Sequence, residues 1–169
     1  MTAPSSNMRI LTDLYRYNNW ANARVFAACA ALDAALLREE APGTHGTIEG
    51  TLKHLVGVEA AYLLMLQGLP LDQGDGQEAY FAQELAWFAE HAAQVGAGYL
   101  QLLADQGDAL LDRELSVPWF DFALTASDGL LQVLSHSAQH RAQVLSALGA
   151  RDFEVPNIDY VFMVGGEGA

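Results

Sequence analysis

Two histidines, His136 and His140, stand four residues apart in the segment 135–141 (SHSAQHR). If this segment is helical, the two imidazoles project from one face on successive turns and can both bind one metal ion. Ser137 stands where the helical zinc motif of metalloproteases has its glutamate base, so that peptidase mechanism is not supported. The pair therefore points to a metal site with another chemistry.

A third histidine, His54, lies in a second segment with helical periodicity, on an apolar strip with Val58 and Ala61. Three histidines from two neighbouring helices leave at least one coordination position open. Such openness is typical of catalytic or substrate-binding metals, since structural zinc sites have four protein ligands. The alternative is that these histidines form hydrogen bonds in the core or lie on a solvated edge. The remaining histidines, His45 and His91, are expected to be solvated.

Composition and charge exclude several classes of function. The chain has 169 residues, with 21 Asp plus Glu against 8 Lys plus Arg, a net charge of −13 that does not suit a nucleic-acid-binding protein. No apolar stretch approaches the roughly 20 residues of a membrane span, and no secretory signal is recognisable, so we expect a cytoplasmic protein. The single cysteine, Cys29, is expected to be a small buried apolar residue. The absence of Glu-x-x-His excludes a ferritin-like di-iron bundle.

The chemistry-bearing residues require helices to position them. Apolar residues recur every three or four positions, the period of one helix face, in four segments: about 8–32, 47–67, 77–105 and 125–148. These segments predict an all-α fold, an antiparallel four-helix bundle, in a single domain over 1–169. Before the last helix, the residues from Leu115 to Leu124 predict a short strand pair or an ordered loop.

Polar residues and glycines mark where these helices begin and end. Ser6 or Asn7 is expected to cap the first helix, Thr47 the second, and a capping box of Thr125 and Asp128 the last.

Breaks in the pattern give four further expectations. Gly149 is expected to stop the last helix, and Gly96 and Gly98 predict a bend or a close helix contact in the third. We expect an exposed turn over 72–76, and a tail that packs on the body over 158–164 before a frayed end.

Four short segments, in order along the chain, resemble motifs of the DinB family (the DinB and YfiT-like superfamily). They are 17–22 (YNNWAN), 46–55 (GTIEGTLKHL), 136–144 (HSAQHRAQV) and 156–160 (PNIDY). The resemblance covers most of the chain and includes histidine at all three expected ligand positions.

The resemblance implies a divalent metal ion, commonly zinc or nickel, held by His54, His136 and His140 in a bundle that often forms a homodimer. Family members of known chemistry transfer low-molecular-weight thiols such as bacillithiol or mycothiol. Leu63 and Leu64 stand where many members carry an aromatic residue.

The leading hypothesis is a metal-dependent enzyme acting on a small molecule, with thiol S-transfer as its chemistry and a low-molecular-weight thiol as cosubstrate. Two alternatives stay open: a metal-dependent hydrolase, and a non-enzymatic, dimeric metal-binding protein of the stress response or of small-ligand binding. Asn18, Asn22, Glu59 and Arg141 are candidates for the pocket or for the surroundings of the ligands, or are ordinary helix-surface residues. No catalytic residue is assigned.

Overall fold

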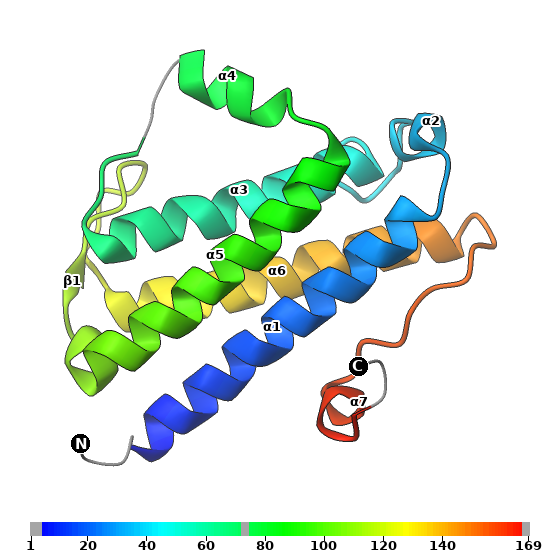
Figure 1. Ribbon diagram of the computed structural model, residues 1–169. Coiled ribbons are helices and arrows are strands. Elements are labelled where there is room, and N and C mark those ends of the chain that lie inside the picture. The colour runs from blue at the N-terminus through cyan, green and yellow to red at the C-terminus, as the bar shows by residue number, and fades with distance from the viewer. Residues whose placement is uncertain (1–4, 72–74, 167–169) are drawn as a thin grey trace.

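Four long helices form the body of the protein (Figure 1). This computed structural model describes residues 5–71 and 75–166. The long helices are α1 (Ser6–Ala30), α3 (Ile48–Gln67), α5 (Leu85–Gln106) and α6 (Ala126–Gly149). The short elements are α2 (Ala34–Leu37), α4 (Asp75–Phe81), the 3-10 helix η1 (Gly107–Leu110), strands β1 (Glu114–Leu115) and β2 (Leu124–Thr125), and α7 (Tyr160–Val164). The predicted all-α four-helix bundle is confirmed.

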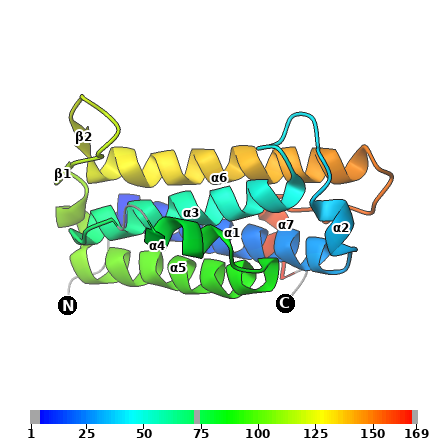
Figure 2. The same ribbon diagram turned by 90° about the horizontal axis from the view of Figure 1, so that it is seen from above.

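The four long helices form two pairs that run in opposite directions. α1 and α6 run one way through the bundle, and α3 and α5 run the other way (Figures 1 and 2). Each of α1 and α3 packs against both α5 and α6, so the pairs α1–α5 and α3–α6 are antiparallel while α1–α6 and α3–α5 are parallel. The parallel pair α3–α5 requires a connection that returns along the bundle, and α4 lies in that connection.

Side-chain caps fix where three of the long helices begin. The Ser5 hydroxyl accepts a hydrogen bond from the Met8 N–H at 3.2 Å, so α1 begins slightly before the expected caps. Thr47 caps α3 as predicted, accepting from the Gly50 N–H at 2.8 Å. The capping box that opens α6 is also confirmed.

The predicted third helix is interrupted. Residues 75–81 form α4 and residues 85–106 form α5, with a non-helical break between them. Across this break the two helices are in contact: the Tyr80 ring of α4 lies edge-on to the Phe88 ring of α5, with ring centroids 5.1 Å apart. The expected turn over 72–76 is not found in its described part, since residues 75 and 76 already belong to α4 and 72–74 lie outside the described residues.

The glycines of α5 allow neighbouring helices to approach closely, and α5 is continuous through them. A Cβ at Gly98 would lie 2.6 Å from Cδ2 of Leu63 on α3, and a Cβ at Gly96 would overlap the Asn19 side chain of α1. The expected close contact is therefore confirmed on both sides of α5.

The segments around α6 follow the sequence pattern. β1 and β2 form the expected antiparallel pair, with Leu115 opposite Leu124. α6 includes Gly149 and is capped by Ala150, one residue later than expected.

The tail contacts the body at α1, where the Tyr17 hydroxyl donates a hydrogen bond to the Ile158 carbonyl at 2.9 Å. The expected packing over 158–164 is only partly found, because α7 has no buried residue and Val161 and Val164 are each 67% exposed. The described end of the tail reaches residue 166, and residues 167–169 of the expected frayed end lie outside the described part.

The core divides into two apolar clusters, one toward each end of the bundle. One contains Tyr15, Tyr99 and Leu130, and the other contains Phe88 and Leu148. Between these clusters, at the middle of the bundle, the long helices carry buried polar residues, which are described below.

The single cysteine lies in the core, as expected. Cys29 is fully buried, and burial raises the pKa of its thiol to about 11, which fits an unreactive core cysteine.

No helix in the described part of the chain has the length and apolarity needed to cross a membrane.

Candidate metal centre

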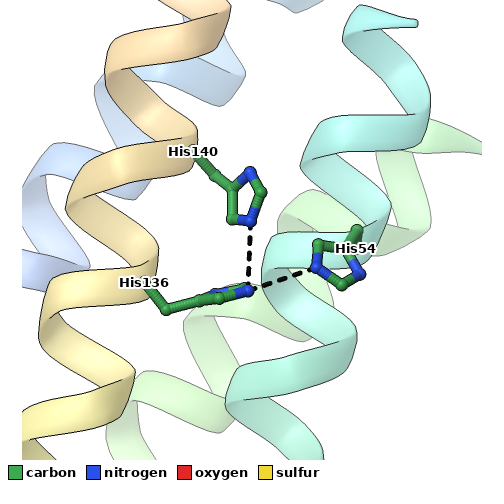
Figure 3. A group of neighbouring side chains, drawn as sticks. All are labelled: His54, His136 and His140. Atoms are coloured by element: carbon green, nitrogen blue, oxygen red, sulfur yellow. Dashed lines mark hydrogen bonds between the residues drawn. The ribbon is translucent and has the colours of Figure 1, made fainter. Parts of the chain in front are cut away.

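Three histidines from two helices converge between α3 and α6 (Figure 3). His136 and His140 lie on successive turns of α6, and His54 projects toward them from α3. The Nε2 atoms of His136 and His140 are 3.0 Å apart, and those of His136 and His54 are 3.2 Å apart. One nitrogen from each ring falls within a single group whose members are all within 4.8 Å of one another.

Hydrogen bonding alone does not account for this arrangement well. A neutral ring nitrogen carries either one proton or one lone pair, yet Nε2 of His136 faces two ring nitrogens in different directions. A bound cation would accept all three lone pairs at once. Zn–N bonds of about 2.05 Å in tetrahedral geometry place ligand nitrogens roughly 3.3 Å apart, close to the spacing found here. The cluster is therefore capable of binding a metal ion.

Gln143 orients one of the three rings. The Nδ1–H of His140 donates to Oε1 of Gln143 at 2.7 Å, which leaves the lone pair of His140 on Nε2, the atom that faces the cluster. Sequence reasoning assigned Gln143 no role, although its position three residues after His140 on a helix places the two side chains within reach. The Nδ1 atom of His136 is buried and has no hydrogen-bond partner among the described residues.

The electrostatic environment keeps these imidazoles neutral. Burial, and to a lesser extent repulsion between neighbouring imidazolium rings, lowers the pKa of His54 and of His136 to about 4. Burial also lowers the pKa of His140. Since a histidine binds metal through a neutral nitrogen, protons compete weakly with a metal at neutral pH.

The two histidines expected to be solvated differ from each other. The exposed ring of His45 stacks on His54, with ring centroids 4.3 Å apart and planes 13° from parallel. The His45 backbone N–H donates to the Thr51 hydroxyl at 2.8 Å, which ties this connector to α3. His91 is half-buried and stacks on Trp87, so it is only partly solvated. The sequence offered no signal for the contact of His45, since it depends on how the connector folds back.

The four candidates for the surroundings of the site form one buried network, and none is a surface residue. Asn18 and Asn22 of α1, Glu59 of α3 and Arg141 of α6 are each at most 3% exposed. Oε1 of Glu59 accepts hydrogen bonds from the Asn18 and Asn22 amides at 2.7 and 3.0 Å, and from the hydroxyl of Ser137 at 2.6 Å.

Arg141 completes this network from the other side. Its Nη1 donates to the amide oxygens of Asn18 and Asn22, at 2.5 and 2.7 Å. The two asparagines thus stand between a buried carboxylate and a buried guanidinium. Ser137 and Arg141 directly follow the two α6 histidines in sequence, so the network fixes the rotation of α6 and with it the direction of His136 and His140.

A comparison of the sequence with models of protein families identifies the family of this chain. The DinB family model matches residues 5–166. The chain belongs to the DinB family. This match includes all four segments that carried the sequence resemblance.

Two solved structures share the fold of this chain. A DinB-like protein from Bacillus cereus is 19% identical to this chain, with a TM-score of 0.64. The matched region covers 85% of this chain and 91% of the Bacillus cereus chain. The second structure is YfiT from Bacillus subtilis, described as a probable metal-dependent hydrolase with an unusual four-helix bundle topology. It is 14% identical to this chain, with a TM-score of 0.68, and the matched region covers 91% of this chain and 93% of the YfiT chain. At these identities the likeness shows the fold. A search of curated proteins found no match.

A cavity of about 550 Å³ adjoins the histidine cluster of this DinB protein. His54 and Leu64 both line it. Leu63, the neighbouring leucine, is buried and lies against Gly98 of α5. Of these two leucines, Leu64 is therefore the one that lines the cavity.

Proposed function

We propose that this chain is a metal-dependent enzyme that acts on a small molecule, with one divalent ion held by His54, His136 and His140. The observation that carries the proposal is the convergence of three Nε2 atoms at spacings that suit a common metal ligand set. Imidazole ligands suit zinc and nickel, which are the two ions proposed.

The chain's own residues prepare this site in two ways. Gln143 holds the proton on Nδ1 of His140, and burial keeps His54 and His136 neutral at physiological pH. The three histidines therefore act as ligands and not as acids or bases. When bound with an open coordination position, such an ion lowers the pKa of a thiol or a water molecule and supplies a nucleophile near neutral pH.

The proposed reaction is S-transfer, in which a low-molecular-weight thiol of the bacillithiol or mycothiol type loses its proton and its sulfur bonds to an electrophilic carbon of a small molecule, while a leaving group such as halide departs from that carbon. Membership of the DinB family supports this choice. Hydrolysis is the second candidate, and the shared fold with YfiT, described as a probable metal-dependent hydrolase, favours it. A non-enzymatic metal-binding role is the third.

An activity assay with defined metal loading tests the proposal. Protein loaded with zinc or nickel is offered bacillithiol or another small thiol with an aryl halide acceptor, and separately a panel of simple esters and amides. We expect thioether formation that depends on the metal and is lost in His140→Ala but kept in Gln139→Ala, an exposed residue of the same helix. Ester or amide cleavage alone would favour the hydrolase, and no turnover with either metal would favour the non-enzymatic role.

The expected homodimer, the cytoplasmic location and the stress-response role stay predictions.

A further inference from the structure

The cavity beside the histidine cluster has an apolar wall built from three parts of the chain. It lies between α3, α4 and the loop that joins β1 to β2. Gly57 and Ala61 form its floor on α3, and Phe81 of α4 and Trp119 of the loop form part of the opposite wall. A Cβ at Gly57 would lie 2.9 Å from the Phe81 ring, so the glycine is needed for the two walls to approach as they do.

The cavity borders the proposed metal centre at His54. His54 lines the cavity and also contributes its Nε2 atom to the cluster. From His54, the lining continues along one face of α3 to Leu64, a distance of roughly 15 Å at 1.5 Å per residue. A molecule that reaches the cluster with one end can therefore place its other end in this cavity.

The chemistry of the wall selects the kind of group that binds there. Among the described residues that line the cavity, none is Asp, Glu, Lys or Arg. Its volume of about 550 Å³ is in the range of small-molecule sites, roughly 300–1,000 Å³. Burial of an apolar group against this mostly apolar wall is favourable, whereas a charged group would lose its hydration and find no opposite charge among the described lining residues. The polar groups of the lining include His54, Gln77 and the hydroxyl of Tyr80, which has no hydrogen-bond partner among the described residues.

We propose that this cavity binds an apolar group of ring size carried by the electrophilic substrate, and that the reacting end of that substrate lies at His54, His136 and His140. This inference rests on the proposed function, because it assigns the substrate class of the same site. A hydrophilic thiol cosubstrate does not match this wall and approaches from outside the cavity.

Hydroxamates with one metal-binding head and tails of different size test the proposal on zinc-loaded protein. Acetohydroxamate and 2-naphthohydroxamate share the head, and the naphthyl ring adds apolar surface. Because each roughly 55 Å² of buried apolar surface corresponds to about a tenfold change in affinity, we expect the naphthyl compound to bind at least tenfold more tightly. Equal affinities for the two compounds would overturn the proposal.

Variants that fill the cavity separate its contribution from that of the metal. Ala61→Phe, or Leu64→Trp if the first variant does not fold, is expected to reduce the naphthyl preference below about threefold, by removing the buried area. The affinity for acetohydroxamate and the zinc content should stay unchanged. Ala104→Phe, on the exposed face of α5, is the matched control and should keep the full preference. Full preference in a folded, cavity-filled variant would contradict the assignment.

A metal-free measurement distinguishes failure of this inference from failure of the proposed function. 2-Naphthamide lacks the hydroxamate head, and its binding to the metal-free protein is followed by ligand-observed NMR. We expect binding to the wild type and the Ala104→Phe control, and loss of binding in Ala61→Phe. If the protein binds naphthamide but no zinc, the metal-dependent function fails and the apolar site stands. If zinc binds but naphthamide does not, the apolar site fails.

Discussion

The position of a single proton determines whether His140 presents a lone pair to the cluster, because Nε2 is the nitrogen that faces His136. The Gln143 side-chain oxygen accepts that proton at Nδ1, and the lone pair is thereby directed from Nε2 toward His136 and His54. Partners of this kind hold a ligand ring in one orientation, so their loss weakens metal binding even though they do not touch the metal.

Gln143→Ala is therefore expected to weaken zinc affinity by about 10- to 100-fold without unfolding the protein. Competition with a chromophoric chelator measures the affinity, and circular dichroism checks the fold. Gln139→Ala, on the exposed side of the same helix, should bind zinc as the wild type does. Equal affinities in the two variants would show that Gln143 has no part in the site.

The buried pair of Arg141 and Glu59 depends on its two bridging asparagines. Arg141 is 2% exposed and Glu59 is 1% exposed, so neither charge is solvated if its partners are removed. Burial lowers the pKa of Arg141, and the attraction of Glu59 opposes that shift.

Arg141→Met is expected to lower the free energy of unfolding by about 3–5 kcal/mol, because it leaves a buried carboxylate without its counter-charge. Arg16→Met, which removes an exposed ion pair with Asp13, should cost about 0–1 kcal/mol. Urea unfolding of both variants measures the difference. Addition of Glu59→Leu to Arg141→Met should recover part of the loss, and a cost for Arg141→Met no larger than that for Arg16→Met would contradict the role of the network.

At the scale of elements, α6 carries two of the three clustered histidines, and its start is fixed by a reciprocal cap. The Asp128 N–H donates to the Thr125 hydroxyl at 3.2 Å, and the Thr125 N–H donates back to the Asp128 carboxylate at 2.8 Å. This cap lies about three turns before His136, so it stabilises the helix without shaping the metal site.

Thr125→Ala is expected to reduce the free energy of unfolding by about 1 kcal/mol, which corresponds to roughly 2–4 °C in the thermal midpoint for a chain of this length. Differential scanning calorimetry measures the shift. Ser135→Ala, at an exposed position of α6, should change stability by less than about 0.5 kcal/mol. A large fall in zinc affinity in Thr125→Ala would show that the cap does more than stabilise the helix.

The elements that sequence predicts well are those with local signals. The caps at Thr47 and Thr125 and the periodicity of α3 and α6 place His54, His136 and His140 on helix faces that meet. The break between α4 and α5 contains no proline or glycine that would have predicted it from the sequence. It occurs where Tyr80 packs against Phe88, a contact that depends on the fold.

The same distinction applies within the site. Ligand spacing is local, whereas the stacking of His45 on His54 and the pairing of α1 asparagines with Glu59 bring together residues distant in the chain. Single-sequence patterns carry no information on such contacts.

At the scale of the whole molecule, the neutral histidines couple stability to pH. The pKa of His54 and of His136 is about 4 in the folded protein, against an ordinary value near 6.5 in the unfolded chain. Between these values the unfolded state binds more protons, so the stability of the metal-free protein falls as pH decreases from about 6.5 toward 4. Above about 6.5 these two groups contribute no pH dependence.

Urea unfolding of metal-free protein at pH 7.5, 6 and 5 is expected to show this loss of stability. The double variant His54→Ala/His136→Ala should lose less stability over the same range, because the groups responsible are gone while the carboxylates still titrate. An identical pH dependence in the wild type and the double variant would contradict the assigned pKa shifts.

The central claim is that His54, His136 and His140 together bind one divalent metal ion. Equilibrium dialysis against zinc or nickel, followed by elemental analysis, tests it most directly. We expect about one ion per wild-type chain and loss of that ion in His54→Ala, His136→Ala and His140→Ala, as for a site with three protein ligands. His91→Ala, outside the cluster, should keep the wild-type content. Unchanged metal content in all three ligand variants would contradict the claim.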